Sequence, residues 1–366
     1  MIFEKFDISI SEIEQNKIKK LVDLAFLNAK LSKDQIEELL NTINYQTLPY
    51  LQQKAVEKRK EIYGDKLYIR GLIEISNYCK KDCLYCGIRK SNKNVNRYRY
   101  DEQTIKKIID HGYSRGYHTI VMQGGEDDYY TDEKLSRIIH DTKEKYPDIA
   151  ITLSVGERSK SSYLNLYDSG ADRFLLRHET ANQDHYALLH PKEMSLETRM
   201  QALKNLKEIG YQTGAGFMVG SPFQSMEDIV NDIIFLQDFQ PQMVGIGPYL
   251  NHHETPFYDM PNGKLEHVLI IYSLVRLLVP NGLIPSTTAT SSVNPLGRLQ
   301  ALKSGCNVIM INLSDMDKRQ DYTLYENKSY KGDESDEFLQ IIEQDIIKAG
   351  MEIDFSIGNY KANKGE

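Results

Sequence analysis

Two patterns of apolar residues alternate along most of this chain. Short runs rich in β-branched and aromatic residues are typical of buried strands, and longer stretches with apolar residues every three or four positions are typical of amphipathic helices. The strand-like runs span 67–76, 118–123, 149–155, 173–178, 212–220, 243–250, 283–290 and 307–313. The helical stretches span 101–116, 131–146, 162–170, 196–210, 225–239, 264–279 and 294–305.

This alternation predicts an α/β fold with a parallel sheet, because successive parallel strands need helical crossovers between them. Eight strands fit a (β/α)8 TIM-type barrel better than an open doubly wound sheet, and its reactive residues should follow the strands. Before the first strand, residues 31–43 have a helical period with Ser32 as a suitable N-cap. We therefore expect a helical extension over 1–65, the barrel over 66–350 and a C-terminal tail over 351–366.

Composition narrows the possible partners and compartments. The 366 residues include 40% hydrophobic and 27% charged residues, as in ordinary globular proteins, and the formal net charge is -7. An acidic balance argues against a protein whose main function is to bind nucleic acid. The N-terminus has no apolar segment behind a basic one, and no stretch approaches about 18 apolar residues. We expect a cytoplasmic protein with no nucleic-acid or membrane partner.

Three of the four cysteines lie close together, directly after the first predicted strand. Cys79, Cys83 and Cys86 have the spacing C-x3-C-x2-C, which indicates a metal site rather than a disulfide framework. Three thiolates can bind three irons of a 4Fe-4S cluster and leave the fourth iron open to another ligand. The alternative is structural zinc, which needs a fourth ligand such as Cys306.

The cysteine motif, with Tyr85 before its last cysteine, resembles that of the radical S-adenosylmethionine (SAM) superfamily over the whole predicted barrel. The chain is most similar to the HydE family of FeFe-hydrogenase maturases. The similar segments are 76–99, 119–127, 152–157, 170–182, 210–220, 243–249, 284–289 and 305–312. This resemblance implies S-adenosyl-L-methionine and one 4Fe-4S cluster, because no cysteine follows Cys306 to hold the second cluster that some members carry.

Candidate SAM ligands follow the second, third and fourth strands. Glycines let a backbone approach a ligand closely, and a guanidinium and a carboxylate suit the carboxylate and the ribose of SAM. The resemblance implies that the cofactor-binding residues are Tyr85, Gly124, Gly125, Glu126, Glu157 and Arg177. The alternatives are a simple turn at the glycines and an ion pair between Glu157 and Arg177. We assign no role to His178 or Cys306.

Candidate substrate ligands lie in the last third of the chain. By resemblance they are Thr287, Thr288, Met310, Tyr322 and Tyr325. Hydroxyls and a thioether suit a polar, anionic or metal-bearing ligand, although core packing is an equal alternative for the methionine. One departure from the family precedes the tyrosines, where residues 317–319 read Asp-Lys-Arg in place of an aromatic residue and an arginine.

The resemblance predicts an enzyme in which a low-potential electron donor drives reductive cleavage of SAM to a 5′-deoxyadenosyl radical. The radical acts on a small substrate in the barrel, by resemblance a cysteine-bound iron carbonyl-cyanide species or a related thiol. The enzyme would then assemble the hydrogenase H-cluster, with other hydrogenase maturases as partners. Alternatives are enzymes similar to methylornithine synthase, a lysine mutase, or to biotin synthase. A scaffold that binds zinc or carries a cluster is the non-enzyme alternative.

Overall fold

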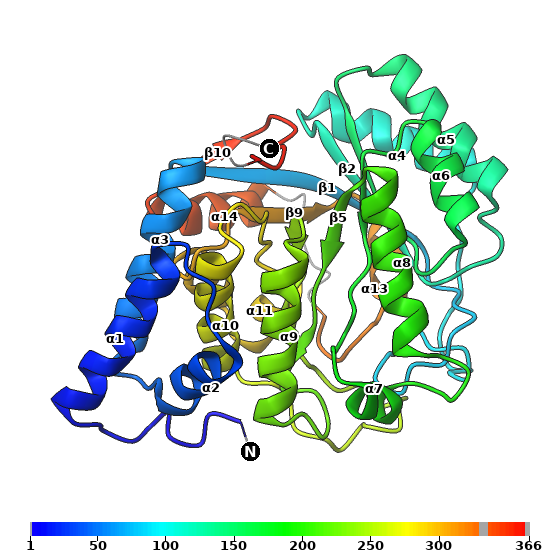
Figure 1. Ribbon diagram of the computed structural model, residues 1–366. Helices are drawn as coiled ribbons and strands as arrows, with labels where there is room; N and C mark the ends of the chain where they lie inside the picture. Colours follow the sequence, from blue (N-terminus) through cyan, green and yellow to red (C-terminus); the bar gives the residue numbers. More distant parts are fainter. Residues whose placement is uncertain (1, 329–335, 363–366) are drawn as a thin grey trace.

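The computed structural model describes residues 2–328 and 336–362, with only the backbone over 336–339. Three helices come first: α1 (Glu12–Phe26), α2 (Lys33–Thr42) and α3 (Leu48–Tyr63). Capping boxes at Ser11 and Ser32 begin the first two, because each serine and the N3 side chain satisfy backbone N–H groups reciprocally. The three helices lie together on one side of the molecule, against α9 (Met226–Phe239) and α10 (Leu265–Leu278) (Figure 1).

Parallel strands form the main sheet, in the order β10-β1-β2-β3-β4-β5-β7, with β9 also paired to β1. Their bounds are β1 (Lys66–Ser76), β2 (Thr119–Gly124), β3 (Ala150–Ser154), β4 (Arg173–Leu175), β5 (Gln212–Ala215), β7 (Met243–Val244), β9 (Val308–Asn312) and β10 (Glu352–Asp354). Two further strands, β6 (Met218–Val219) and β8 (Gly247–Pro248), pair with each other.

Two isolated bridges close this sheet into a ring. Met243 in β7 pairs in parallel with Leu283, and Pro285 pairs in parallel with Val308 in β9, which pairs with β1. The predicted α/β barrel is therefore confirmed. The predicted strand 283–290 is wrong beyond its first residues, because Pro285 has no N–H for a ladder and the chain then enters α11 (Thr288–Val293).

The predicted strands 212–220 and 243–250 are each interrupted at the same level of the barrel. A Cβ on Gly216 would lie 2.0 Å from the carbonyl oxygen of Gly245, so the two backbones touch at this point. Such an approach needs glycine and interrupts the regular pairing. Each run is consequently split into two short strands, β5 and β6 in one case and β7 and β8 in the other.

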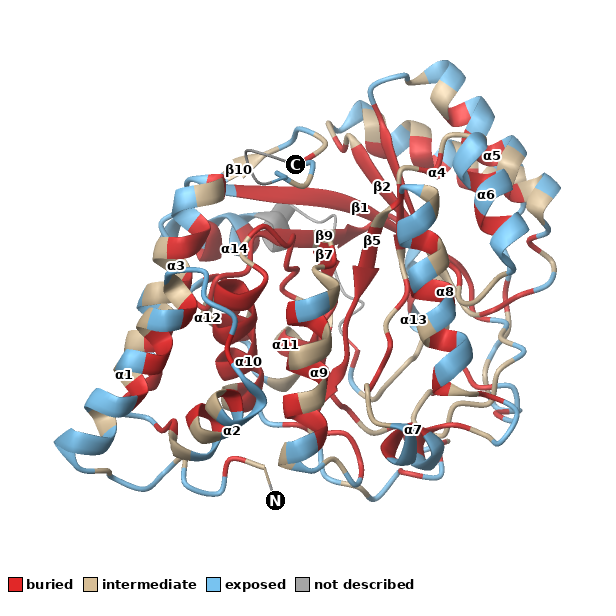
Figure 2. Cartoon of the chain, in the orientation of Figure 1, coloured by how far each residue is buried: buried red, intermediate tan, exposed pale blue. Residues whose placement is uncertain are grey.

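Helices surround the strands, and most begin at a capping side chain. The remaining helices are α4 (Glu102–Ser114), α5 (Asp132–Lys145), α6 (Lys160–Asp168), α7 (Gln183–Leu189), α8 (Leu196–Ile209), α12 (Gly297–Leu302), α13 (Met316–Asp321) and α14 (Asp336–Lys348). Helix α10 is buried at every position except Glu266, because the N-terminal helices cover its outer face (Figure 2). None of the helices in the described ranges combines the length and apolarity that a membrane crossing requires.

The C-terminal segment packs against the N-terminal end of the barrel, beside β10 (Figure 1). The guanidinium of Arg173 donates to the carbonyl oxygens of Ile357 (2.8 Å) and Gly358 (3.3 Å) and to Asn359 Oδ1 (2.8 Å). Gly358 has φ +55°, and a Cβ there would lie 2.5 Å from the ring of Tyr68. The sequence did not predict β10 or this packing, because no strand-like run marks the segment.

A second buried arginine joins two segments of the barrel, the turn at residues 280–282 and the residues 305–307 that precede β9. Arg276 in α10 donates to the carbonyl oxygens of Pro280 (2.7 Å), Gly282 (2.8 Å) and Gly305 (2.9 Å) and to Asn307 Oδ1 (3.0 Å). Its side chain is fully buried. Without it, the three carbonyl oxygens would lose this donor, whereas Asn307 Oδ1 would keep the N–H of Ile284 (2.9 Å).

We predict that Arg276→Ala lowers the free energy of unfolding by about 3 kcal/mol or more, because it removes four hydrogen bonds of a buried guanidinium, three of them fully buried. Urea unfolding followed by far-UV circular dichroism measures the change. Arg137→Ala is the matched control, since Arg137 also bonds a partner, Glu102, but on the surface. Equal midpoints for the two variants would contradict this role of Arg276.

Candidate functional site

The loop after β1 is held by one arginine. Arg97 donates to four carbonyl oxygens of the same loop: those of Asn77, Ile88 (2.8 Å), Arg89 (2.7 Å) and Asn92 (3.1 Å). Five donors in a rigid fork suit this arrangement, which a lysine could not reproduce. The conformation of the loop is thus fixed by its own residues.

This loop carries Cys79, Cys83 and Cys86, whose thiols all line one cavity. Burial raises the pKa of Cys83 to about 12 and also raises those of Cys79 and Cys86. A thiolate is therefore unfavourable here unless a bound cation compensates its charge. Metal binding supplies that compensation, because a coordinating thiol is deprotonated by the metal.

The spacing of the three sulfurs argues against zinc. Within the described ranges, no group of three metal-ligating side chains that includes these cysteines has its ligand atoms within 4.8 Å of one another. Ligands on one tetrahedral zinc, with bonds of about 2.3 Å, have sulfurs about 3.8 Å apart. Cys306 precedes β9 at the opposite end of the barrel, where it cannot be the fourth ligand. A wider spacing fits a cluster in which each cysteine binds a different iron.

The cavity has a volume of about 350 Å³ and opens among the carboxyl ends of the strands. Its lining includes every predicted site residue except Glu157. Those residues are Cys79, Cys83, Tyr85, Cys86, Gly124, Gly125, Glu126, Arg177, Thr287, Thr288, Met310, Tyr322 and Tyr325. The structure thus brings together side chains that lie up to about 250 residues apart in sequence.

Gly124, the last residue of β2, and Gly125, which follows it, allow close contact with the segment that carries the cysteines. A Cβ on Gly125 would lie 2.2 Å from the carbonyl oxygen of Tyr78. The next residue, Glu126, accepts a hydrogen bond from the N–H of Lys80 on its carbonyl oxygen (2.8 Å). These contacts explain why glycine is needed there, and the role of this turn in SAM binding stays a prediction.

Glu126 links the ends of β2 and β3. Its Oε1 accepts the N–H of Glu157 (2.9 Å), and Lys81 Nζ lies 3.6 Å from Glu126 Oε2 and 3.7 Å from Glu157 Oε2. Burial raises the pKa of Glu126. A carboxylate in this position attracts a ligand that brings a positive charge or a hydrogen-bond donor.

Arg199, from α8, was missed by the sequence analysis. Its Nε is in very short contact with Glu157 Oε1, and its Nη1 donates to the carbonyl oxygen of Arg177 (2.6 Å). Arg199 lines the cavity, whereas Glu157 does not. The alternative of an ion pair between Glu157 and Arg177 is wrong, and the predicted contact of Glu157 with SAM stays a prediction.

The partner of Arg177 is Glu179, also missed by the sequence analysis. Arg177 Nη2 donates to Glu179 Oε2 (2.7 Å), and its buried Nε has no hydrogen bond to any described residue. Glu179 has φ +67°, a left-handed conformation that costs a non-glycine residue about 1 kcal/mol or more. Both side chains line the cavity, so this strained turn brings a carboxylate beside a guanidinium at its wall.

His178 has a structural position. Its Nδ1 accepts the N–H of Gly216 (3.2 Å), so its Nε2 carries the proton and donates to Asp232 Oδ1 (3.2 Å). Asp232 also accepts the N–H of Ala181 (2.5 Å). Burial lowers the pKa of His178 to about 3, so the ring is neutral at ordinary pH. It orients the chain around Arg177 and Glu179 without facing the cavity.

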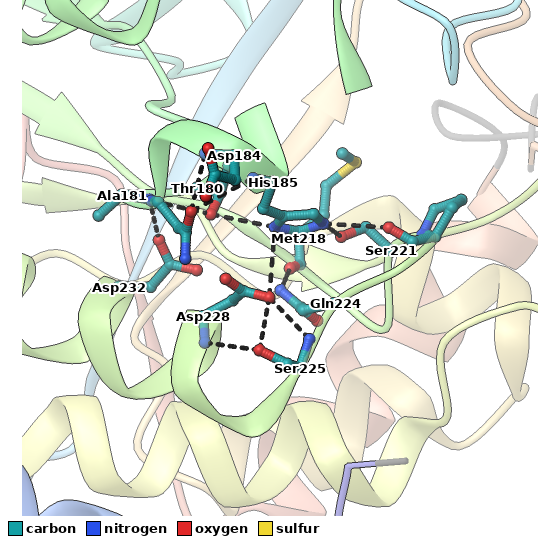
Figure 3. Close-up of polar contacts among 12 residues, drawn as sticks. Thr180, Ala181, Asp184, His185, Met218, Ser221, Gln224, Ser225, Asp228 and Asp232 are labelled. Carbon is teal, nitrogen blue, oxygen red and sulfur yellow. Dashed lines mark hydrogen bonds and ion pairs between the residues drawn. The ribbon is translucent and has the colours of Figure 1, made fainter. Parts of the chain in front are cut away.

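A second histidine fixes the next turn, as Figure 3 shows. His185 Nδ1 contacts Thr180 Oγ1 (3.1 Å), and its Nε2 contacts the carbonyl oxygen of Pro222 (3.0 Å). Ser225 and Asp228, at the start of α9, form a capping box, and Asp228 Oδ2 lies 3.9 Å from His185 Nδ1 (Figure 3). The turn after β4 is thus tied to the loop after β6.

Hydroxyl groups lie at and behind the inner wall of the cavity, where Thr287 and Tyr322 line it and Tyr272 is buried behind them. Tyr272 OH donates to the carbonyl oxygen of Ile246 (2.8 Å) and lies 3.5 Å from Thr287 Oγ1. Tyr322 OH accepts from Gln123 Nε2 (3.3 Å), which places the predicted tyrosine against the end of β2. Met310 is partly exposed to the cavity from β9.

A buried ion pair, also missed, crosses the cavity wall. Lys328 Nζ donates to Glu74 Oε1 (2.5 Å) and to the carbonyl oxygen of Tyr322 (2.8 Å). Glu74 is 1% exposed, and its Oε2 has no hydrogen bond to any described residue. The signal in the sequence was a glutamate in the otherwise apolar end of the first strand.

Another buried charged residue, Arg70, lies in β1, the strand that also carries Glu74. Arg70, opposite Met310 in the β1–β9 ladder, is 4% exposed and contacts Met243 Sδ (3.2 Å). Its Nε and Nη2 have no hydrogen bond within the described ranges. Burial lowers its pKa well below the usual value. Arg70 is therefore buried without a carboxylate partner among the described residues, and it does not line the cavity.

Comparison with known proteins gives two kinds of similarity. A sequence profile described as the radical SAM superfamily matches residues 73–236. The FeFe hydrogenase maturase subunit HydE of Thermotoga maritima is 43% identical over 274 residues, which cover 75% of this chain and 78% of that protein.

Solved structures agree on the fold. The crystal structure of methylornithine synthase has a TM-score of 0.78 at 23% identity and covers 91% of this chain and 97% of its own. The structure of HydG, a maturase of the FeFe hydrogenase, has a TM-score of 0.78 at 18% identity and covers 93% and 76%. With the cysteine loop and its cavity, these similarities show that the chain is a radical SAM enzyme of the HydE family, which uses a 4Fe-4S cluster and S-adenosylmethionine.

Proposed function

We propose that this enzyme is a maturase of FeFe hydrogenase that acts on a small anionic substrate inside the barrel. The observation that carries the proposal is one continuous cavity with three cysteines at its mouth. Its wall includes polar atoms of Glu74, Glu126 and Arg177 that have no hydrogen bond to a described residue. The sequence similarity to HydE of Thermotoga maritima supports the same function.

The bound cluster and SAM supply the reactive species: one electron from a low-potential donor cleaves the S–C5′ bond of SAM and gives methionine and a 5′-deoxyadenosyl radical. The chain contributes the ligands. Cys79, Cys83 and Cys86 would hold three irons of the cluster, and since no fourth described cysteine lies in reach, SAM would have room to bind the remaining iron.

SAM-binding groups surround the mouth. We infer that Arg177 and Arg199 hold the carboxylate of SAM and that Glu179 accepts from its amino or ribose donors. Gly124, Gly125 and Glu126 place backbone and carboxylate oxygens beside the cysteine loop, where they suit the ammonium group. Tyr85 lines the same region of the cavity.

Substrate-binding groups lie further inside. Thr287 and Thr288 offer hydroxyl donors, Met310 offers a thioether, and Tyr322 and Tyr325 close the wall. A small anion that carries a soft metal or sulfur atom, such as a cysteine-bound iron carbonyl-cyanide species, matches these properties.

The chain also covers part of the mouth of the cavity. We call residues 322–328 the strap, since they cross the mouth between the cysteine loop and the loop after β8. Gly87 donates its N–H to the carbonyl oxygen of Leu324 (2.9 Å), and Glu326 donates its N–H to that of Asn251 (2.8 Å). An enclosed site protects a reactive radical from unwanted hydrogen donors.

Maturation of an FeFe hydrogenase tests this function. We expect active hydrogenase when the apoenzyme is incubated with this chain, the other maturases, SAM and a reductant. Omission of the chain should abolish the activity. Formation of methylornithine from lysine, or of biotin from dethiobiotin, would instead show one of the other enzyme activities. Failure to release 5′-deoxyadenosine under reducing conditions would indicate a scaffold.

We predict that Cys83→Ser abolishes both cluster assembly and the release of 5′-deoxyadenosine, because it removes one of three iron ligands. Iron and sulfide analysis after anaerobic reconstitution and chromatography of the nucleoside measure these losses. The control is Cys306→Ala, which removes a buried thiol at the opposite end of the barrel. If both variants lose the cluster equally, the assignment of ligands is wrong.

We predict that Glu179→Gln weakens SAM binding by roughly tenfold, because a hydrogen bond to a charged group contributes about 1.5 to 3 kcal/mol. The cluster content should stay unchanged. Equilibrium binding of SAM to the cluster-loaded protein measures the effect. Glu197→Gln, on the exposed first turn of α8, is the control. Normal affinity in Glu179→Gln would remove this residue from the SAM site.

We predict that Lys328→Met lowers the free energy of unfolding by about 3 kcal/mol, because it leaves Glu74 as a buried charge without its partner. The double variant Glu74→Gln/Lys328→Met should recover most of this loss, since it removes both charges. Urea unfolding of the wild type, Lys328→Met and the double variant measures the free energy of unfolding of each. A double variant as unstable as Lys328→Met would show that the charge of Glu74 is not the cause.

A further inference from the structure

A second group of metal-ligating side chains lies where the strap meets the loop after β8. His252 and His253 belong to that loop, and Glu326 belongs to the strap, about 70 residues later. The three side chains each offer one ligand atom, and these atoms all lie within 4.8 Å of one another. None of the three lines the cavity.

The three side chains make contacts that a simple surface ion pair would not need. His253 Nδ1 is in very short contact with Glu326 Oε1, and the N–H of His253 donates to the same oxygen (3.0 Å). The rings of His252 and His253 are stacked, with centroids 4.6 Å apart and planes 16° apart. Two imidazoles and one carboxylate therefore converge on one region from two separate segments.

His252 is held rigidly. It is 4% exposed, and the ring edge with Nε2 faces Gly87, where a Cβ would lie 2.8 Å from that nitrogen. Its Nδ1, on the opposite edge, accepts the N–H of Glu254 (3.1 Å). The lone pair on Nδ1 is thus directed away from Gly87. A metal at Nδ1 would take over this lone pair from the amide.

We propose that His252, His253 and Glu326 bind a divalent transition-metal ion that fastens the strap to the loop after β8. Imidazole and carboxylate ligands suit Zn²⁺ and Fe²⁺, and three protein ligands leave a coordination position for water. The carboxylate of Glu254, with Oε1 3.7 Å from His253 Nε2, adds negative charge beside the site. The ion would be separate from the cluster, because the two share no ligand.

The consequence concerns the mouth of the barrel. The strap also carries Tyr322, Tyr325 and Lys328, which line the cavity. A metal bound through Glu326 would hold these side chains in place, since it adds a link between the strap and a buried histidine. Occupancy of this site would therefore favour the closed cavity over an open one.

The competing explanation is a simple ion pair between His253 and Glu326. Such exposed pairs contribute little to stability and do not require His252. A matched control exists on the surface: His140, Asp141 and Glu144 in α5 also place three ligand atoms within 4.8 Å, but all three are exposed and belong to one helix. That cluster has neither a buried ligand nor a second segment.

The experiment uses the cluster-loaded protein under anaerobic conditions, so that the three cysteines are already occupied. Co²⁺ is the probe, because its visible absorption distinguishes nitrogen and oxygen ligands from thiolates. Titrations compare the wild type with His253→Ala, Glu326→Ala and the control His140→Ala. Limited proteolysis of the strap, with and without Zn²⁺, provides a second readout.

We expect the wild type and His140→Ala to bind one Co²⁺ without thiolate bands. His253→Ala and Glu326→Ala should each weaken binding by at least roughly tenfold, the minimum expected from loss of a ligand. Zn²⁺ should slow cleavage of the strap in the wild type but not in Glu326→Ala. Absence of binding in the wild type, unchanged affinity in both site variants, or loss in His140→Ala would each overturn the proposal.

Discussion

The burial of charge at the mouth of the barrel is the constraint on which this site depends. Three thiols lie where burial raises their pKa values, so they are stable as thiols and become thiolates only when a metal compensates them. Cluster binding and deprotonation are therefore one coupled process. The loop must hold the cysteines in place beforehand, which explains why Arg97 binds four of its carbonyl oxygens.

The same constraint governs the charged residues of the wall. Arg177 pairs with Glu179, Arg199 with Glu157 and Lys328 with Glu74, and each pair joins residues that would be costly to bury singly. Arg177 Nε and Glu74 Oε2 have no hydrogen bond to a described residue, so two of the three pairs are only partly satisfied. A bound ligand can supply the missing hydrogen bonds. Because unsatisfied buried polar atoms are unfavourable, the site should bind polar or charged ligands in preference to apolar ones.

The sequence allowed prediction of the strands and cysteines, because both depend on local patterns. Apolar runs identify the strands, and the triplet spacing identifies the cluster loop. Arg199 and Glu179 were not predictable in the same way. Arg199 occupies an ordinary position in an amphipathic helix, and it becomes a site residue only through Glu157, 42 residues earlier. Glu179 depends on a left-handed backbone that no composition rule indicates for glutamate.

Strand breaks were also beyond sequence patterns. The runs around Gly216 and Gly245 are apolar and β-rich throughout, but the contact between these two backbones interrupts both. The interruption has a consequence for the site, because Gly216 also bonds His178 and Glu179 through its N–H and C=O groups. One close approach of glycines thus shortens two strands and sets the turn that carries Arg177 and Glu179.

The two ends of the barrel are closed by different means. At the N-terminal end, Arg173 binds the C-terminal segment through three acceptors. At the mouth, the strap is held by two backbone hydrogen bonds and by Lys328. Lys328 in the strap bonds Glu74, whose carboxylate faces the cavity. A change of charge on Glu74 would therefore weaken this link to the strap. A ligand that changed the charge on Glu74 would act on the strap through its bond to Lys328.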